Sequence, residues 1–127
     1  MDRSRLRLIG GFAVLLVFSF ATVLPLCGAM FRCGCSIRRG ESQCNVHTSG
    51  VPHCPWCEGG AKAFLPGYGI AMLAAGATLA GVMSRRGTPA WVGIASAIVA
   101  YLLLVSVAAL VTAKAMHYPY WFGLRLK

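Results

Sequence analysis

The sequence predicts an all-α membrane protein with three transmembrane helices and a cysteine- and histidine-rich loop between the first and second helices. The first observation behind this prediction is composition. The chain of 127 residues is 57% hydrophobic and only 12% charged, which is more apolar surface than a soluble domain of this size can bury. The second is that the apolar residues form three long uncharged runs, each near the roughly 20 residues that a helix needs to cross a bilayer.

The runs divide a single membrane domain, residues 1–127, into segments. We expect transmembrane helices at about 8–26, 63–84 and 90–113, the cysteine- and histidine-rich loop at about 27–62, and an aromatic and basic tail at 114–127. The second run is rich in Gly and Ala, so its preference for lipid is weaker and a re-entrant segment is its alternative. The tail is expected to lie among the lipid headgroups, where aromatic rings gather.

Basic residues favour an N-terminus in the cytoplasm. Arg3, Arg5 and Arg7 precede the first run, and Arg85 and Arg86 lie in the short turn between the second and third runs. Short basic segments close to the membrane weigh most in setting orientation, although the loop and the tail also carry basic residues. The loop and the tail are therefore expected on the outer face, in an oxidising compartment.

The first run also has the basic start of a signal peptide. The residues before Cys27 are Leu24, Pro25 and Leu26, however, and lipoprotein processing requires small residues there. We therefore expect a retained membrane anchor.

None of the three runs contains Asp, Glu, Lys, Arg or His, which ion and proton pathways usually need. Small residues four positions apart are instead typical of close contacts between membrane helices, and such pairs are Gly76 with Ala80, Ala77 with Gly81, and Gly93 with Ala97. We expect membrane lipids and another membrane protein as partners. No nucleic-acid partner is expected, because lipid phosphates explain the net charge of +9 and no base-reading motif is present.

All six cysteines lie between Cys27 and Cys57. The segment Cys54-Pro-Trp-Cys57-Glu-Gly-Gly resembles the knuckle of zinc-ribbon and rubredoxin-type sites, in which a CxxC turn places two sulfurs on one edge of a tetrahedron. Cys44 and His47 supply a second pair at the same spacing. The expected cofactor is zinc or another transition metal, and the predicted ligands are Cys44, His47, Cys54 and Cys57, with Cys33, Cys35 and His53 as secondary candidates.

A redox function is the first alternative for the same residues. Cys54-Pro-Trp-Cys57 also resembles the active-site dithiol of thioredoxin-like and disulfide-isomerase-like proteins, which implies a redox pair of Cys54 and Cys57. In those proteins a helix that starts at the motif lowers the pKa of the first thiol. Here Gly59 and Gly60 follow the motif, so no supporting helix is expected before about Ala61. Structural disulfides are the second alternative.

The rest of the sequence favours a protein that is not an enzyme. It has only three acidic residues and no hydrolase triad, P-loop or dinucleotide motif, so no catalytic residues are predicted beyond the alternative redox pair. We expect a small integral membrane subunit or accessory protein of a larger membrane complex, with its loop made rigid by a metal site or by disulfides. A membrane thiol–disulfide redox protein and a protein that binds or delivers copper or zinc remain open.

Overall fold

A computed structural model describes residues 3–35, 44–85 and 87–126 of the chain. The elements are three long helices, a short 3-10 helix and a two-stranded hairpin: α1 (Arg3–Phe31), η1 (Asn45–His47), α2 (Pro55–Met83), α3 (Ala90–Ala115), β1 (Tyr120–Trp121) and β2 (Leu124–Arg125). Each long helix is long and apolar enough to cross a membrane. The predicted fold class is thus confirmed: this is an all-α integral membrane protein with a cysteine-rich loop between its first two helices. Arg86, used above for orientation, lies outside the described residues.

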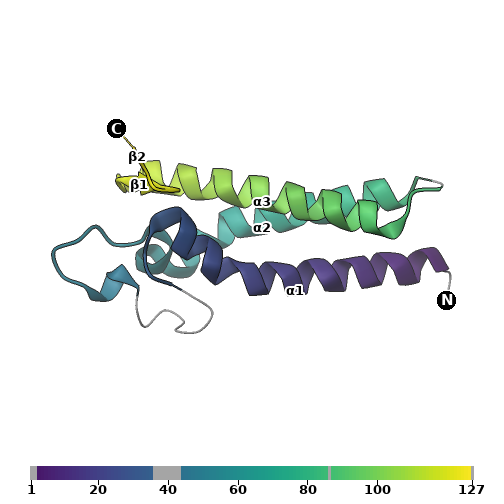
Figure 1. Cartoon of the computed structure of the whole chain (residues 1–127), viewed down its shortest axis with the longest axis horizontal. Coiled ribbons are helices and arrows are strands. Elements are labelled where there is room, and N and C mark those ends of the chain that lie inside the picture. Colours follow the sequence, from purple (N-terminus) through teal and green to yellow (C-terminus); the bar gives the residue numbers. More distant parts are fainter. Residues whose placement is uncertain (1–2, 36–43, 86, 127) are drawn as a thin grey trace.

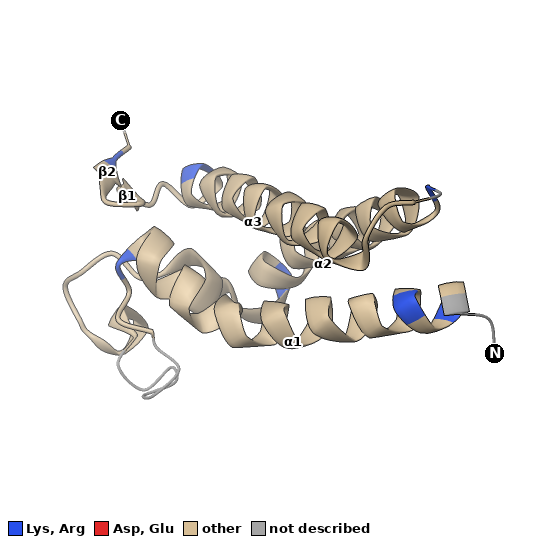
Figure 2. Cartoon of the chain, turned by 45° about the vertical axis from the view of Figure 1, so that its right-hand side comes forward, with Lys and Arg blue, Asp and Glu red and all other residues tan. Residues whose placement is uncertain are grey.

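The three helices form an elongated bundle in which α2 runs opposite to α1 and α3 (Figure 1). The closest pair is α2 with α3, and α1 contacts both. The described N-terminal end of α1 and the turn between α2 and α3 lie at one end of the bundle, whereas the cysteine loop and the hairpin lie at the other (Figure 1). Described basic residues gather toward the two ends of the helices (Figure 2), as expected for a chain whose middle lies in hydrocarbon.

Two helices extend further toward the cysteine loop than the apolar runs predict. Helix α1 passes through Pro25 and ends at Phe31, and α2 begins at Pro55 instead of near residue 63. Pro55 occupies the first helical position, where its missing N–H group would have no helical partner anyway. The backbone N–H of Glu58 then donates to the carbonyl of Cys54 at 2.8 Å. The expectation that no helix precedes about Ala61 is therefore wrong, because one helical turn directly follows Cys54.

The first turn of α2 is separated from the rest of the helix by Gly60. Its backbone angles, φ 55° and ψ −144°, lie in a region that essentially only glycine adopts. The break changes the direction of the chain between the turn that carries Cys57 and the membrane-spanning part of α2. Gly60 therefore sets the direction in which this cysteine is presented.

Small residues do make close helix contacts, but not at every predicted position. A side chain at Gly76 would meet Phe12 of α1, and one at Gly67 would meet Ala108 of α3 at 2.6 Å. Gly93 is likewise buried against α2. Gly81, in contrast, is exposed. Among the described residues, apart from its chain neighbours and its own helix backbone, no atom lies within 4 Å of where its side chain would begin. The Ala77–Gly81 pair therefore faces away from the bundle.

The C-terminal hairpin closes the cysteine end of α1. Phe122 and Gly123 form a two-residue turn with φ values of 46° and 77°, and Trp121 pairs with Leu124 across it. The backbone N–H of Phe122 donates to the carbonyl of Met30 at 2.8 Å, and the Tyr118 hydroxyl donates to the carbonyl of Phe31 at 2.7 Å. Two carbonyls that the end of a helix leaves without helical partners are satisfied in this way. The predicted headgroup position of the tail is not tested, but Tyr118 is buried.

Aromatic rings connect this end to the centre of the bundle. Successive rings along the path pack at centroid distances between 4.9 and 6.3 Å, and the path runs through Tyr118, Phe31, Trp56, Phe64, Tyr68, Tyr101 and Phe18. It draws on all three long helices and on the tail. The cysteine loop thus rests on a packed aromatic base, continuous with the membrane-spanning core.

Candidate metal centre

The six cysteines converge at one end of the molecule from three separate stretches of chain. The first stretch is the end of α1 and the residues just after it, the second lies before η1, and the third is the start of α2; they carry Cys27, Cys33, Cys35, Cys44, Cys54 and Cys57. Five of the side chains are buried and Cys57 is half-buried. All six are free thiols in this structure. Such a gathering of soft donors is suited to binding a metal ion.

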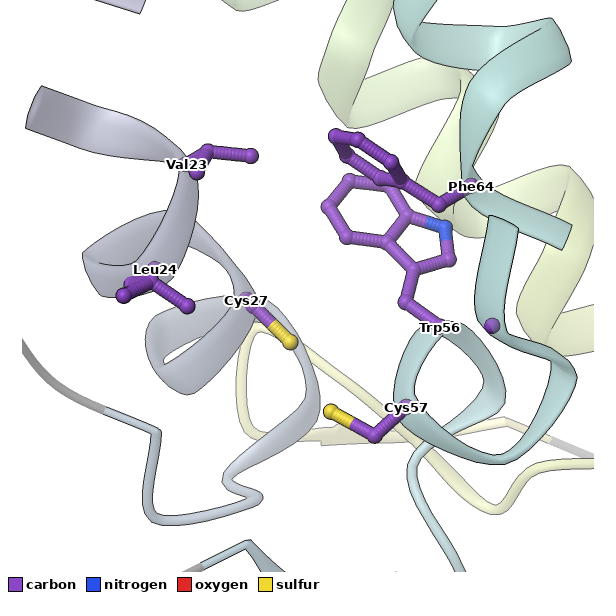
Figure 3. Close-up of a pocket in the computed structure, with 7 residues that line it drawn as sticks. Val23, Leu24, Cys27, Trp56, Cys57 and Phe64 are labelled. Atoms are coloured by element: carbon purple, nitrogen blue, oxygen red, sulfur yellow. The ribbon is translucent and has the colours of Figure 1, made fainter. Parts of the chain in front are cut away.

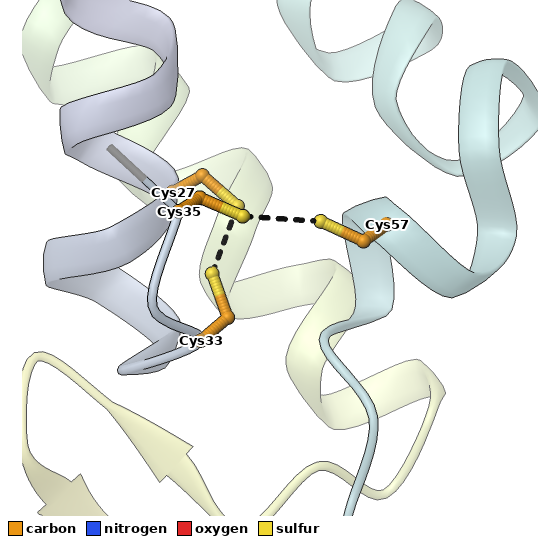
Figure 4. A group of neighbouring side chains, drawn as sticks. All are labelled: Cys27, Cys33, Cys35 and Cys57. Carbon is orange, nitrogen blue, oxygen red and sulfur yellow. Dashed lines mark hydrogen bonds between the residues drawn. The ribbon is translucent and has the colours of Figure 1, made fainter. Parts of the chain in front are cut away.

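Two sets of four sulfurs have the spacing of a metal site, with all four sulfurs within 4.8 Å of one another: Cys27, Cys33, Cys35 and Cys57, and Cys33, Cys44, Cys54 and Cys57. Figure 4 shows the first set, in which the Cys27 and Cys33 sulfurs are 3.4 Å apart and those of Cys35 and Cys57 are 3.5 Å apart. Tetrahedral zinc–sulfur bonds of about 2.3 Å place sulfurs about 3.8 Å from each other. The observed separations are therefore compatible with direct coordination after small side-chain adjustments.

The sulfurs also affect one another's protonation. The Cys27 sulfur lies 3.4 Å from both the Cys33 and the Cys54 sulfurs. Hydrogen bonding from Cys27 lowers the pKa of the Cys33 thiol and that of the Cys54 thiol, because it stabilises their thiolate forms. Burial, followed by hydrogen bonding with Cys33, raises the pKa of the Cys35 thiol to about 12. The cluster thus contains both thiolate-favouring and thiol-favouring positions.

The chain reverses direction after α1, and this turn brings Cys33 and Cys35 back toward the helix. Arg32 has φ 51° and Gly34 has φ 87°, so both adopt left-handed conformations just after the last helical residue. The carbonyl of Cys35 then lies directly against Gly28 of α1, in the space that a side chain would need. Glycine at position 28 therefore permits the close approach that places Cys35 beside Cys27.

Asn45 ties the three cysteine-bearing stretches together. Its backbone N–H donates to the carbonyl of Cys33 at 2.8 Å, and its side-chain oxygen accepts a hydrogen bond from the backbone N–H of Cys54 at 2.8 Å. Its side-chain nitrogen donates to the carbonyl of Pro52 at 2.7 Å and to the hydroxyl of Tyr118 at 3.1 Å. Neither Asn45 nor Tyr118 was singled out from the sequence as part of the site, since the hydrogen bond between them joins residues 73 positions apart.

Three of the four ligands predicted from the sequence, Cys44, Cys54 and Cys57, come together in one set, with Cys33 as the fourth sulfur. His47 lies exposed on η1 and belongs to neither set. The other histidine of the loop, His53, has Nε2 at 3.2 Å from the carbonyl of Thr48 and Nδ1 at 3.8 Å from a carboxylate oxygen of Glu58.

The secondary candidates Cys33 and Cys35 both belong to the cluster, as does Cys27, which was not among the predicted ligands. The sequence feature that could have pointed to Cys27 as a ligand is its short spacing to the Cys-Gly-Cys segment.

A partly open cavity of about 210 Å³ adjoins the cluster between α1 and the start of α2. Its walls are mostly apolar and consist of Val23, Leu24, Cys27, Trp56, Cys57, Gly60 and Phe64. Figure 3 shows the sulfurs of Cys27 and Cys57 pointing toward each other below the rings of Trp56 and Phe64. These two sulfurs therefore have free volume next to them.

Fold and site together define an integral membrane protein in which groups of cysteines lie within metal-binding distance of one another. No protein-family model, curated protein or solved structure matches the chain. Its function is therefore inferred from the geometry of the cysteine cluster and the membrane helices.

Proposed function

We propose that this protein is a small integral membrane subunit or accessory protein of a larger membrane complex, and that its cysteine loop is a rigid cap held by a structural metal site. The metal is zinc or another soft transition-metal ion. Its ligands are Cys33, Cys44, Cys54 and Cys57. The observation that carries the proposal is the clustering of these four sulfurs, all within 4.8 Å of one another.

The donor chemistry supports a structural role for the metal. Four thiolates suit zinc, copper(I) or iron–sulfur chemistry, and a set closed by four protein ligands leaves no open position for a substrate. An ion bound here joins the segment after α1, the segment before η1 and the start of α2. It therefore fixes the loop to both flanking helices.

The helix surfaces support a role as a subunit. Outward-facing residues of α2 include the large apolar Ile70 and Leu73, next to the small residues Ala77 and Gly81. Small residues on an outer face allow the backbone of another membrane helix to approach closely. A rigid cap at one end and an apolar flank along the side together offer two surfaces to a larger complex.

Metal analysis of the protein, purified in a mild detergent under reducing conditions, tests the site. We expect at least one transition-metal ion per chain, and one ion fewer in the Cys54→Ser variant. His47→Ala is the matched control, because the exposed His47 lies within the same loop, and this variant should keep the ion. Less than about a tenth of an equivalent of metal in the unmutated protein would overturn the proposal. Loss of the ion in His47→Ala would instead identify His47, and not Cys33, as the fourth ligand.

Thiol–disulfide exchange is the second candidate. It is favoured by the position of Cys54 directly before helix α2, by the hydrogen bond from Cys27 that lowers the pKa of the Cys54 thiol, and by the cavity beside Cys57. In this reaction the Cys54 thiolate attacks a disulfide of a partner protein, a mixed disulfide forms, and one partner thiolate leaves. The Cys57 thiolate then releases the second partner thiolate by forming the Cys54–Cys57 disulfide. Cys57→Ser would trap the mixed disulfide. We expect no such adduct, because the Cys54 side chain is fully buried and out of reach of a partner disulfide. A reproducible adduct would favour the redox function.

Metal delivery differs from a structural site in its exchange rate. An ion that serves as a staple should stay bound for hours against free isotope-labelled metal. Exchange within minutes would instead support a delivery protein.

A further inference from the structure

We infer that the cluster holds two metal ions rather than one, bridged by the sulfurs of Cys33 and Cys57. The inference rests on the proposed function, since it assumes an ion in the set that contains Cys44 and Cys54. It adds a second ion bound by Cys27, Cys35 and the same two bridging sulfurs.

The overlap between the two four-sulfur sets is the main observation. They share two members, Cys33 and Cys57, and together they include every cysteine of the chain. Two tetrahedra that share one edge have this arrangement: six corners, of which two belong to both. A thiolate sulfur has enough lone pairs to bind two metal ions at once. All six cysteines are then ligands, and none is left as a spare thiol.

Charge favours the second ion as well. One divalent ion with four thiolates carries a net charge of minus two. Two divalent ions with six thiolates carry the same net charge. The second ion therefore adds no net charge to the buried site, which matters because burying charge is costly. With a single ion, Cys27 and Cys35 would remain beside it as buried thiols. The second ion gives these soft donors a ligand role.

The cavity provides room for the required adjustment. Cys27 and Cys54 belong to different ions in this arrangement, yet their sulfurs are only 3.4 Å apart. Two tetrahedra that share an edge, with metal–sulfur bonds of about 2.3 Å, place end sulfurs on different ions about 5 Å apart, so these two sulfurs must separate by roughly 2 Å. Cys27 borders the cavity of about 210 Å³, so its side chain can move without displacing a packed neighbour.

Metal counting after anaerobic reconstitution with zinc, by native mass spectrometry, tests the inference. We expect two ions per chain in the unmutated protein. Cys35→Ser and Cys44→Ser each disrupt only one set, so each should hold one ion. Cys33→Ser disrupts both sets and should hold none. If the unmutated protein holds only one ion and Cys35→Ser retains it, the two-ion centre is overturned and the proposed function stays intact. No ion in the unmutated protein would overturn both.

Cobalt titration of the unmutated protein avoids the risk that a variant fails to fold. Two cobalt(II) ions joined by thiolate bridges couple antiferromagnetically. The electron paramagnetic resonance signal should therefore increase up to one equivalent of cobalt and decrease toward the second. A signal that increases in proportion up to two equivalents would indicate separate sites, and saturation at one equivalent would indicate a single ion; either result would overturn the bridged pair.

Discussion

Asn45 contacts every cysteine-bearing stretch of the cluster but is not a metal ligand in the proposed site. Its side-chain oxygen fixes the backbone of Cys54, and its side-chain nitrogen reaches the hydroxyl of Tyr118. Residues that hold ligands in place are often nearly as important for metal affinity as the ligands themselves. In the proposed metal site, Asn45 and Tyr118 would be such positioning residues.

We predict that Asn45→Ala weakens metal binding by about 10- to 100-fold. The substitution leaves the backbone N–H of the buried Cys54 without its partner, which costs about 1–3 kcal/mol of stability. Competition with a chromogenic chelator measures the affinity, and thermal unfolding in detergent measures the stability. The exposed His47, two positions further along, provides the matched control His47→Ala. Equal affinities for the two variants would contradict the prediction.

Sequence reasoning could group the CxxC pair with Cys44 as candidate ligands because their spacing is local. It favoured His47 over Cys33 for the same reason, since His47 repeats that spacing. The placement of Cys33 instead depends on where α1 ends and on the left-handed conformation of Arg32. Such a reversal has no local sequence signature in a residue other than glycine.

At the scale of elements, the end of α1 and the start of α2 act as two supports that face each other across the cluster. Gly28 on α1 accommodates the returning segment, and Gly60 in α2 directs the turn that carries Cys57. Glycine is required at these two positions for different reasons, close approach at the first and backbone conformation at the second. Both supports lie outside the expected membrane runs.

Gly28→Ala should destabilise the cluster by about 1–3 kcal/mol, because its methyl group would collide with the carbonyl oxygen of Cys35. We expect faster alkylation of Cys35 in this variant, and mass spectrometry of the modified peptide measures the rate. Gly10→Ala is the control on the same helix, since no atom from another described part of the chain lies within 4 Å of the added methyl group. Unchanged alkylation in Gly28→Ala would show that the segment has room to shift.

Hydropathy predicted the three helices because a membrane requires long apolar runs, and their number and order are confirmed. The helix ends were not predictable from hydropathy. Helix α1 continues to Phe31, where the hairpin satisfies its last carbonyls, and that contact joins residues 87 positions apart. The aromatic residues next to the Phe122–Gly123 turn are typical of a hairpin. The aromatic and basic composition of the tail favoured a headgroup position instead.

At the scale of the whole molecule, the bundle separates inward-facing from outward-facing small residues. Gly67 lies between α2 and α3, and Gly81 faces outward. The two glycines on one helix therefore distinguish contacts within the chain from contacts with a partner.

Gly67→Leu should reduce the thermal stability of the isolated protein, because the new side chain would collide with Ala108. Gly81→Leu should leave that stability unchanged and weaken co-purification with a membrane partner in mild detergent. Densitometry measures the second effect as the amount of partner that co-purifies with each variant, corrected for the background seen without a functional affinity tag. Retention of all partners by a folded Gly81→Leu variant would remove this face from the proposed interface.

The expected orientation is tested with two added cysteines at opposite ends of the bundle. Ser49 lies exposed in the cysteine loop, and Ser84 lies exposed next to the turn between α2 and α3. With the N-terminus in the cytoplasm, a membrane-impermeant maleimide added to intact cells should label Ser49→Cys above the unmutated background, and Ser84→Cys only after lysis. The reverse pattern would place the loop in the cytoplasm.

The hairpin that seals the end of α1 also imposes an order on biogenesis. Tyr118 is 87 positions from Phe31 and 73 from Asn45, so the ribosome releases the loop well before the residue that fastens it. During this interval α2 and α3 are inserted into the membrane, while the segment that carries the six cysteines still lacks its contacts with Tyr118. The newly made loop is therefore most vulnerable to oxidation and mispairing at this stage, and its maturation is coupled to the insertion of the last helix.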